Sequence, residues 1–278
     1  MTKKVKDFIT KCILLFLGIA TMAVIAFLFL YVFFKGSGII SVEFITGYPS
    51  GTPLGTDGGI FPALIGSLLS GLLSALIGGV IGIGAALYLS FYYDGRWFRK
   101  LVYLSVLGLS GIPSIVFGLI TYVFLIYILG LPRCILCASI AVSMMMIPFV
   151  AIRAKKIFDE SRARYMERSL ALGISKEYAI AKMILPHTAL DILSTVALAM
   201  TYGMGATAPV LYTGAVMVSD IPQNLLSPYM SLPYHLYMLV NNGFSVEYAF
   251  GTAFVLLAML LIIHLVIRVL YILRDARR

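Results

Sequence analysis

Six apolar runs, each longer than the roughly 18 residues that mark a candidate membrane helix, divide this chain of 278 residues. In lipid, every backbone N–H and C=O must be bonded within the protein, so such runs cross the bilayer as helices. Only 12% of the residues are charged, about half the fraction of a typical soluble domain. We therefore expect an all-α polytopic membrane protein with six transmembrane helices and a single domain, residues 1–278. The predicted spans are about 12–34, 62–92, 101–129, 134–152, 189–217 and 248–272.

The first run follows the basic start MTKKVKDFITK and could be mistaken for a secretory signal peptide. Its apolar stretch reads CILLFLGIATMAVIAFLFLYVFF, which is longer than the roughly 7–15 residues of a signal peptide's hydrophobic region. No clear A-x-A cleavage pattern follows it. We therefore interpret this run as an uncleaved first span.

The positions of lysine and arginine predict the orientation, because cytoplasmic loops are enriched in both residues. Nineteen of the 21 fall in segments that a cytoplasmic N-terminus would place inside, and only Lys35 and Arg133 remain for the outer side. Both termini are therefore predicted to be cytoplasmic. The net charge of +9 reflects topology and contact with anionic lipid, not nucleic-acid binding, since no basic stripe with interleaved aromatics accompanies it.

The sequence contains no motif of its own for nucleotide hydrolysis or covalent catalysis. No G-x-x-x-x-G-K-[ST], H-E-x-x-H or G-x-S-x-G pattern occurs, so we predict a non-enzyme without a cofactor or metal site. Cys134 and Cys137 are expected to be small apolar packing residues, because no second Cys or His pair completes a zinc site. His264 lies within the sixth span, and we expect a neutral imidazole bonded to a neighbouring helix instead of a proton relay.

The second run carries small residues every four positions, which places them in rows on a helix face. Small side chains let another helix approach closely. We interpret the rows as a packing face; helices that slide along it during a transport cycle are the alternative. The rows are Ser70, Ser74, Gly78 and Gly82, and beside them Ser67, Gly71, Ala75 and Gly79.

Two outer segments differ in character. Residues 35–61 are rich in Gly, Pro, Ser and Thr and predict a surface loop. Residues 218–247 contain no Lys or Arg but combine prolines with aromatics, which favours a re-entrant or interfacial segment. Its tyrosines, Tyr229, Tyr234 and Tyr237, are expected at the level of the lipid headgroups.

The inner segment 153–187 is the longest polar stretch of the chain. Asp159 and Glu160 suit the beginning of a helix, and Gly173 supplies the left-handed residue that ends one. Ser175 can cap a second short helix that runs to Pro186. The predicted structure is helix, tight turn, helix at the inner membrane face, and an ordinary interfacial amphipathic loop explains it equally well.

The spacing Glu167-x5-Gly173-x11-Leu185-Pro186 resembles the "EAA" loop of the MetI-like permeases of ABC importers. Arg168 and Ser169 stand where that loop has two alanines, and Met183 stands where it has isoleucine. The resemblance implies that this segment docks into a groove of a cytoplasmic ATPase, which would bind the ATP. The residues assigned to coupling are Glu167, Arg168, Ser169, Leu172, Gly173, Leu185 and Pro186.

Further blocks resemble the phosphate-importer permease subunit of the PstA type, in the order of that family and over nearly the whole chain from residue 58. They read GGIFPALIGSLL, GIGAALYLSFY, GIPSIVFGL, ATAPVLYTG and SLPYHLYML. The resemblance implies the type I importer permease fold in the bacterial cytoplasmic (inner) membrane and import of phosphate. It also implies a second permease subunit, two ATP-binding cassette subunits and an extracytoplasmic substrate-binding protein as partners.

A polar solute would need backbone groups exposed by Gly and Pro along its path. Residues 112–118 and 203–209 meet that need. The path residues expected are Pro113, Ser114, Gly205, Thr207 and Pro209 within these segments, and Tyr202 next to the second one.

One block departs from the resemblance. The family pattern Arg-x-x-Gly-Glu-Thr-Ala-Pro corresponds here to Tyr202-Gly-Met-Gly-Ala206-Thr-Ala-Pro, so both intramembrane charges are missing. The partner permease could supply the anion-binding groups, or the solute could differ. A non-transporting scaffold or sensor is a further alternative. An intramembrane enzyme is weaker, because no catalytic pair or set of metal ligands lies at matching depth in the spans.

Overall fold

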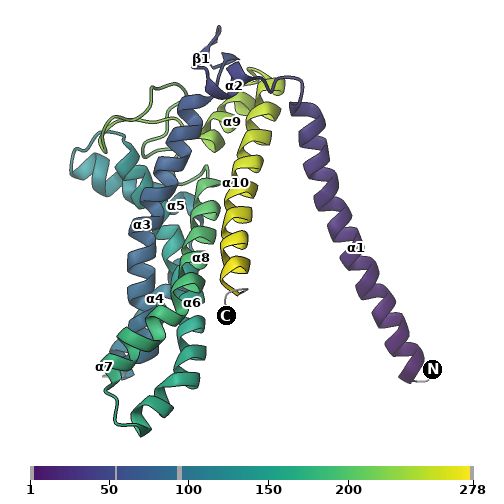
Figure 1. The fold of residues 1–278 in the computed structure, drawn as a ribbon. Helices are drawn as coiled ribbons and strands as arrows, with labels where there is room; N and C mark the ends of the chain where they lie inside the picture. The colour runs from purple at the N-terminus through teal and green to yellow at the C-terminus, as the bar shows by residue number, and fades with distance from the viewer. Residues whose placement is uncertain (1–2, 54, 93–95, 276–278) are drawn as a thin grey trace.

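The computed structural model describes residues 3–53, 55–92 and 96–275, and most of them are helical (Figure 1). Among these described residues, five helical stretches are long and apolar enough to cross a bilayer, and they number six if a bent pair of shorter helices is counted as one span. Their order matches the six apolar runs, so the all-α polytopic fold is confirmed. The long helices are α1 (Lys3–Gly36), α3 (Phe61–Phe91), α6 (Ile135–Ala171), α8 (Leu185–Met204) and α10 (Val246–Asp275).

The third span is broken, whereas the sequence predicts one run over residues 101–129. The chain bends by 105° after Ser110. Pro113 explains the break, because it has no N–H to donate and disfavours a helical conformation for the residue before it; its own ψ is 136°, outside the helical range. The pieces are α4 (Arg96–Ser110), α5 (Ser114–Thr121) and the π-helical η1 (Tyr122–Ile128).

The fourth span and the start of the inner polar segment form one helix, α6. The sequence predicts a span that ends near residue 152 and a new helix that begins at Asp159 and Glu160. That helix start is wrong, because α6 continues without interruption to Ala171. No glycine or proline lies between Phe149 and Ala171, and Lys155 forms an i,i+4 salt bridge with Asp159 that supports the helix.

The fifth span lies nearer the cytoplasmic side than the predicted residues 189–217. Helical structure begins with α7 (Lys176–Tyr178), continues through the π-helical η2 (Ala179–Ile184) and ends with α8 at Met204. Residues 205–217 form turns and an isolated bridge instead of a helix. Pro209 accounts for this, since it cannot donate to a helix and restricts the residue before it.

The small-residue rows of α3 are packing faces, as predicted. A Cβ atom added at Gly82 would lie 2.8 Å from Cβ of Val150 on α6. One added at Gly79, in the adjacent row, would lie 3.2 Å from Val196 on α8. The two rows therefore face two different helices, and α3 packs closely between α6 on one side and the side chains of α8 on the other.

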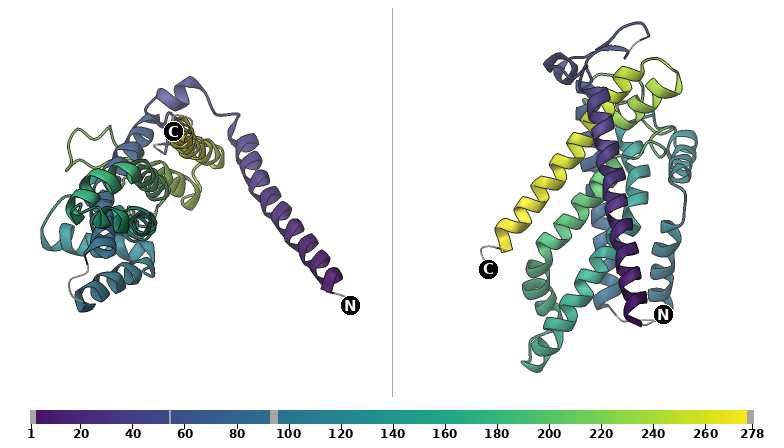
Figure 2. Two further views of the ribbon diagram at one scale, coloured as in Figure 1. Left: turned by 60° about the horizontal axis from the view of Figure 1, so that its bottom comes forward. Right: turned by 90° about the vertical axis from the view of Figure 1, so that its right-hand side faces the viewer.

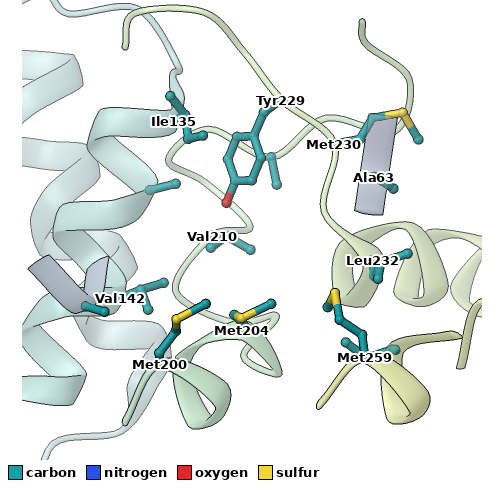
Figure 3. Close-up of a cluster of buried hydrophobic side chains, with 14 of the residues drawn as sticks. Ala63, Ile135, Val142, Met200, Met204, Val210, Tyr229, Met230, Leu232 and Met259 are labelled. Carbon is teal, nitrogen blue, oxygen red and sulfur yellow. The ribbon is translucent and has the colours of Figure 1, made fainter. Parts of the chain in front are cut away.

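The core is continuous from this helix triad into the outer loop. Figure 3 shows two residues from the loop before α9 (Leu232–Asn241): Tyr229 lies near Ile135 of α6, and Met230 lies beside Ala63 of α3. Tyr229 is fully buried, so its expected position among the headgroups is wrong. The loop inserts because its backbone pairs with residues after α8: the Val216 N–H donates to the Tyr229 carbonyl at 3.0 Å.

The first outer segment is a loop with small regular elements, largely as predicted. Helix α2 (Val42–Thr46) is capped by Ser41, whose Oγ accepts from the Phe44 N–H. Strands β1 (Pro49–Ser50) and β2 (Asp57–Gly58) then form a two-stranded antiparallel hairpin.

Helix α1 stands apart from the other spans in Figures 1 and 2. It contacts α10 near its outer end, where the rings of Tyr31 and Phe250 lie 5.6 Å apart and those of Phe33 and Phe254 lie 5.4 Å apart. The described start of α1, the end of α10 and α7 all point toward the same end of the molecule (Figure 1). This arrangement agrees with the prediction that both termini are cytoplasmic.

Candidate functional site

The end of α6, the turn at residues 172–175, α7 and η2 form a protruding segment, which we call the tip. Its structure is helix, tight turn, helix, as the sequence predicts. Gly173 has φ of +75°, a left-handed conformation that glycine adopts without strain. The Gly173 N–H donates to the Leu170 carbonyl, and the Ile174 N–H donates to the Ser169 carbonyl, both at 3.0 Å. These two bonds are the Schellman pattern of a helix end. Ser175 caps α7 by accepting from the Tyr178 N–H at 3.4 Å.

A hydrophobic cluster between α6 and η2 holds the two helical parts of the tip together. Phe158 and Met166 of α6 pack in this cluster with Ile180 and Ile184 of η2. Ser169 is also buried and donates from Oγ to the Tyr165 carbonyl at 2.8 Å. Because α6 and η2 share this core, the tip is expected to move as one body.

The tip is also fastened to the inner end of α3. Nη1 of Arg162 donates to the Ser90 carbonyl at 2.7 Å. The Lys176 ammonium lies 4.8 Å from the ring centroid of Tyr92, a cation–π contact. A force applied to the tip would therefore reach α3 directly, in addition to α6 and α8.

The outer side of the tip is exposed and mixes charged with apolar groups. Glu167, Arg168 and Gly173 are exposed, and Leu172 exposes 79% of its surface. Leu170 and Tyr178, which are not among the predicted coupling residues, expose 51% and 56%. Leu170 and Leu172 thus present apolar surface beside charged groups at the end of this segment.

The seven predicted coupling residues therefore divide into two groups. Glu167, Arg168, Leu172 and Gly173 lie on the exposed tip. Ser169 and Leu185 point into the hydrophobic cluster, and Pro186 lies in the first turn of α8. Leu172 does not share the buried face of Ser169, because α6 ends at Ala171 and the chain turns there.

The break in the third span opens a cavity of about 380 Å³ between α4, α5, α6 and α8. Two of the predicted path residues, Ser114 and Tyr202, line it, and Pro113 shapes the bend beside it. The apolar part of its wall includes Phe117, Pro148 and Phe149.

The remaining predicted path residues lie beyond this cavity. A Cβ atom added at Gly118 of α5 would lie 2.7 Å from the Pro209 carbonyl oxygen, so α5 packs closely on the chain after α8. Thr207 donates from Oγ1 to the Pro233 carbonyl at 3.4 Å. Gly205, the C-cap residue of α8, is exposed.

Arg153 lines the same cavity, and sequence reasoning assigned it only to the inner basic segment. Its guanidinium carbon lies 5.3 Å from the ring centroid of Phe149. That ring in turn stacks on Tyr202, with centroids 6.2 Å apart and planes 19° apart. The i, i+4 spacing of Phe149 and Arg153 was a readable signal, but only a continuous α6 gives that spacing its meaning.

The other candidate groups behave as packing residues. Sγ atoms of Cys134 and Cys137 lie 3.4 Å apart, and both thiols are buried and free. His264 Nε2 lies 3.3 Å from Oγ1 of Thr201 on α8, which confirms the expected bond to a neighbouring helix. Within residues 3–53, 55–92 and 96–275, no group of three or more His, Cys, Asp or Glu side chains could hold a metal ion.

Several curated proteins are similar to this chain over part of its length. One is the probable phosphate transport system permease protein PstA of Methanocaldococcus jannaschii, 32% identical over 143 residues that cover 50% of each chain. Another is the phosphate transport system permease protein PstA 2 of Mycobacterium bovis, 29% identical over 157 residues, which cover 56% of this chain and 52% of that protein. The chain spans about half the length of the curated relatives it matches.

Solved structures with the same fold include inward-facing conformations of the MetNI methionine ABC transporter. One of these chains matches with a TM-score of 0.58 and 18% identity, covering 79% of this chain and 98% of that chain. A second crystal form matches with a TM-score of 0.56. The arrangement of spans is thus that of the type I importer permease fold.

The profile of one protein family matches residues 78–278, which include the tip, the broken third span and the cavity. Its description is "binding-protein-dependent transport system inner membrane component". Because this match covers more than half of the sequence, the chain belongs to the family of binding-protein-dependent transport system inner membrane components.

Proposed function

We propose that this multi-pass membrane protein is a permease subunit of an ATP-driven importer and that its solute is inorganic phosphate. Its partners would be a second permease subunit, two ATP-binding cassette subunits and an extracytoplasmic binding protein. Family membership supports the permease role. The names of the relatives from Methanocaldococcus jannaschii and Mycobacterium bovis support phosphate as the solute.

The observation that carries the proposal is the tip itself. An exposed patch around Leu172 stands on a rigid base that is fastened to α3, α6 and α8 at once. The sequence has no phosphate-binding loop, so the energy of ATP would have to enter through such a contact with a separate ATPase. Closure of the ATPases would move the tip, and the three spans would move with it.

The route of the solute would follow from the same geometry. Helix α3 touches the backbone of α6 and the side chains of α8, so the three helices would rock as one body. The bend at Pro113 gives the third span a separate inner piece, α4, that could shift against this body. The cavity at the bend would then alternate between the two sides of the membrane.

Two substitutions at the tip test the coupling role. Glu167→Lys reverses an exposed charge, and Gly173→Pro removes both the left-handed conformation and the N–H that donates to Leu170. Each should abolish uptake of isotopic phosphate in a deletion strain while membrane insertion persists. Glu160→Lys, an exposed charge reversal two turns earlier on α6, is the control and should transport normally. Normal coupling of ATP hydrolysis to uptake in both tip variants would sink the assignment.

A scaffold or sensor without transport is the second candidate, and the absence of the expected charges at Tyr202 and Ala206 favours it. Such a protein would co-purify with an ATPase whose turnover is independent of substrate. Measuring ATP turnover of the purified assembly with and without phosphate-loaded binding protein separates the two. Stimulation by the loaded protein supports the permease, and its absence together with absent uptake supports the scaffold.

A further inference from the structure

We propose that the cavity at the break in the third span is an oxyanion-binding site and that Arg153 is the cation that recognises the anion. This inference rests on the proposed function and names the group that would select the solute. The site consists of Arg153, Ser114 and Tyr202, which α6, α5 and α8 bring together around one cavity.

The position of Arg153 along α6 indicates how deep it lies in the membrane. At about 1.5 Å per residue, it lies about 27 Å along α6 from Ile135, so its Cα is near the inner edge of a hydrocarbon core of roughly 30 Å. Side chains on a helix lean toward its N-terminus, and the N-terminus of α6 is the outer end. The guanidinium follows that direction, because it lies over the ring of Phe149, one turn toward the outer side.

This orientation is the opposite of what a lipid-facing arginine would adopt. An arginine at the inner edge lowers its free energy by extending toward the cytoplasmic headgroups and water. Arg153 turns into the span, where an arginine is costly unless it lines a polar path. The cavity beside it supplies that path.

The cavity carries the positive charge of Arg153. Among the residues that the structure describes, no Asp or Glu side chain lines it. A salt bridge joins Lys155 to Asp159, one turn further toward the cytoplasm. Lys155, Lys156, Asp159 and Glu160 line a different groove, next to Tyr103. The cavity therefore holds a cation and lacks a built-in counter-charge, which is what an anionic ligand requires.

The cavity wall also contains hydroxyl groups that can donate hydrogen bonds. Ser110 also lines the cavity, but its hydroxyl donates to the Leu107 carbonyl at 2.7 Å. Within the described residues, the hydroxyls of Ser114 and Tyr202 have no such internal acceptor, so both can donate to a bound molecule. Together with the guanidinium fork of Arg153 they form a donor-rich wall.

The ring of Phe149 helps to position the guanidinium of Arg153. The Arg153 guanidinium carbon lies 5.3 Å from the centroid of the Phe149 ring, a cation–π contact that does not occupy its N–H groups as hydrogen-bond donors. Phe149 is itself held by stacking on Tyr202. A planar array of donors suits the paired oxygens of a phosphate or another tetrahedral oxyanion.

Uptake by the complete transporter in a strain without its own phosphate importer tests the site. The variants are Arg153→Gln, Arg153→Lys and, as a matched control, Lys156→Gln, an exposed cation three residues away. We expect at least a tenfold loss of phosphate uptake in Arg153→Gln, a smaller loss in Arg153→Lys and wild-type uptake in Lys156→Gln. Membrane abundance must be equal, and loaded binding protein should still stimulate ATP turnover. Wild-type uptake by Arg153→Gln would overturn the site and leave the proposed function intact.

A second measurement does not depend on removing Arg153. Ser114→Cys places a thiol in the cavity, and reagents of opposite charge, an anionic and a cationic methanethiosulfonate, report on the potential there. The anionic reagent should react with the introduced thiol faster than the cationic reagent does, because Arg153 makes the cavity positive. Inorganic phosphate should slow the reaction of the anionic reagent. Equal rates for the two reagents, or no protection by phosphate or sulfate, would overturn the oxyanion site.

The same uptake measurements distinguish the oxyanion site from the assignment of phosphate as the solute. If wild-type protein carries no phosphate but imports sulfate, and Arg153→Gln loses that import, the phosphate assignment fails and the oxyanion site stands. If the transported solute is uncharged, the oxyanion site is wrong.

Discussion

The hydroxyl of Tyr248 donates a hydrogen bond of 3.0 Å to Oδ1 of Asp57, which joins the start of α10 to the hairpin before α3. The same carboxylate accepts from the Gly58 N–H at 2.9 Å. The bond from Gly58, and then that from Tyr248, lowers the pKa of Asp57 below its usual value, because both stabilise the charged form. The outer hairpin is thus tied to the last span by a charge-assisted bond.

The pKa of Asp57 sets a pH dependence for this tie. Since the pKa is lowered in the folded chain, the stabilisation is complete at pH values above the ordinary aspartate range and is lost as the pH falls through the lowered value. Amide protection of residues 49–58, measured by hydrogen exchange, should therefore persist at neutral and mildly acidic pH. Tyr248→Phe should reduce it at neutral pH, and Tyr237→Phe, at an exposed tyrosine of α9, should not. Equal protection in the two variants would contradict the tie.

The contact of α3 with α6 predicts a size-dependent pair of substitutions. Gly82→Val should destabilise the protein by about 1–3 kcal/mol, since its Cβ would meet Val150 at 2.8 Å. Adding Val150→Ala should recover part of that loss, because it removes Cγ1 of Val150, which would lie 2.9 Å from the added Cβ, while Cβ of Val150 remains. Gly84→Ala on the same helix is the control, since no atom lies within 4 Å of its Cβ. Thermal unfolding in detergent measures all three, and additive effects of the pair would argue against direct contact.

The turn at Gly173 predicts a graded response to substitution. No atom lies within 4 Å of a Cβ at this position, so the cost of Gly173→Ala comes only from φ of +75° and should be about 1–2 kcal/mol. Gly173→Asn should cost less, because asparagine tolerates this conformation better. Gly38→Ala, at an open glycine without positive φ, should be neutral. Thermal unfolding distinguishes the series, and an alanine cost equal to that at Gly38 would refute the conformational reason.

The two sides of the tip should separate stability from coupling. Phe158→Ala removes a fully buried ring that packs on Phe91 with centroids 5.8 Å apart, and should cost about 3–5 kcal/mol of unfolding free energy. Leu172→Ala truncates an exposed side chain, so it should leave unfolding unchanged while it lowers uptake. Thermal unfolding and phosphate uptake on the same preparations give the comparison. A stable Leu172→Ala variant with full uptake would show that this side chain is not part of the coupling surface.

The features that follow from local chemistry were predictable from the sequence. Apolar length predicted the membrane spans, and lysine and arginine predicted that both termini lie on the same side, as the described ends of α1 and α10 do in Figure 1. Gly173 and Ser175 predicted the turn and cap of the tip, because each residue type satisfies a specific backbone need there. The four-residue spacing in α3 predicted a packing face, although the partners of each row, α6 and α8, required the structure.

The errors arose where neighbouring elements outweigh local pattern. Asp159 resembles a helix start, but the continuous α6 and a salt bridge with Lys155 place it within the helix. Tyr229 resembles an interfacial aromatic, but backbone pairing with Val216 draws it into the core. Arg153 reads as one more inner basic residue, because its place beside the cavity depends on the bend at Pro113, far away in the sequence.

The π-helical segment Ala179–Ile184 has a consequence for the tip. A π turn holds about one residue more than an α turn, so the chain before it is rotated by about 100° relative to an uninterrupted α-helix. That offset lets Ile180 and Ile184 meet Phe158 in the cluster while α8 presents Val196 to α3. Deleting a single residue here would turn the exposed patch by more than a quarter of a circle without altering its chemistry. The number of residues in this segment, and not only their kind, decides which way the tip faces.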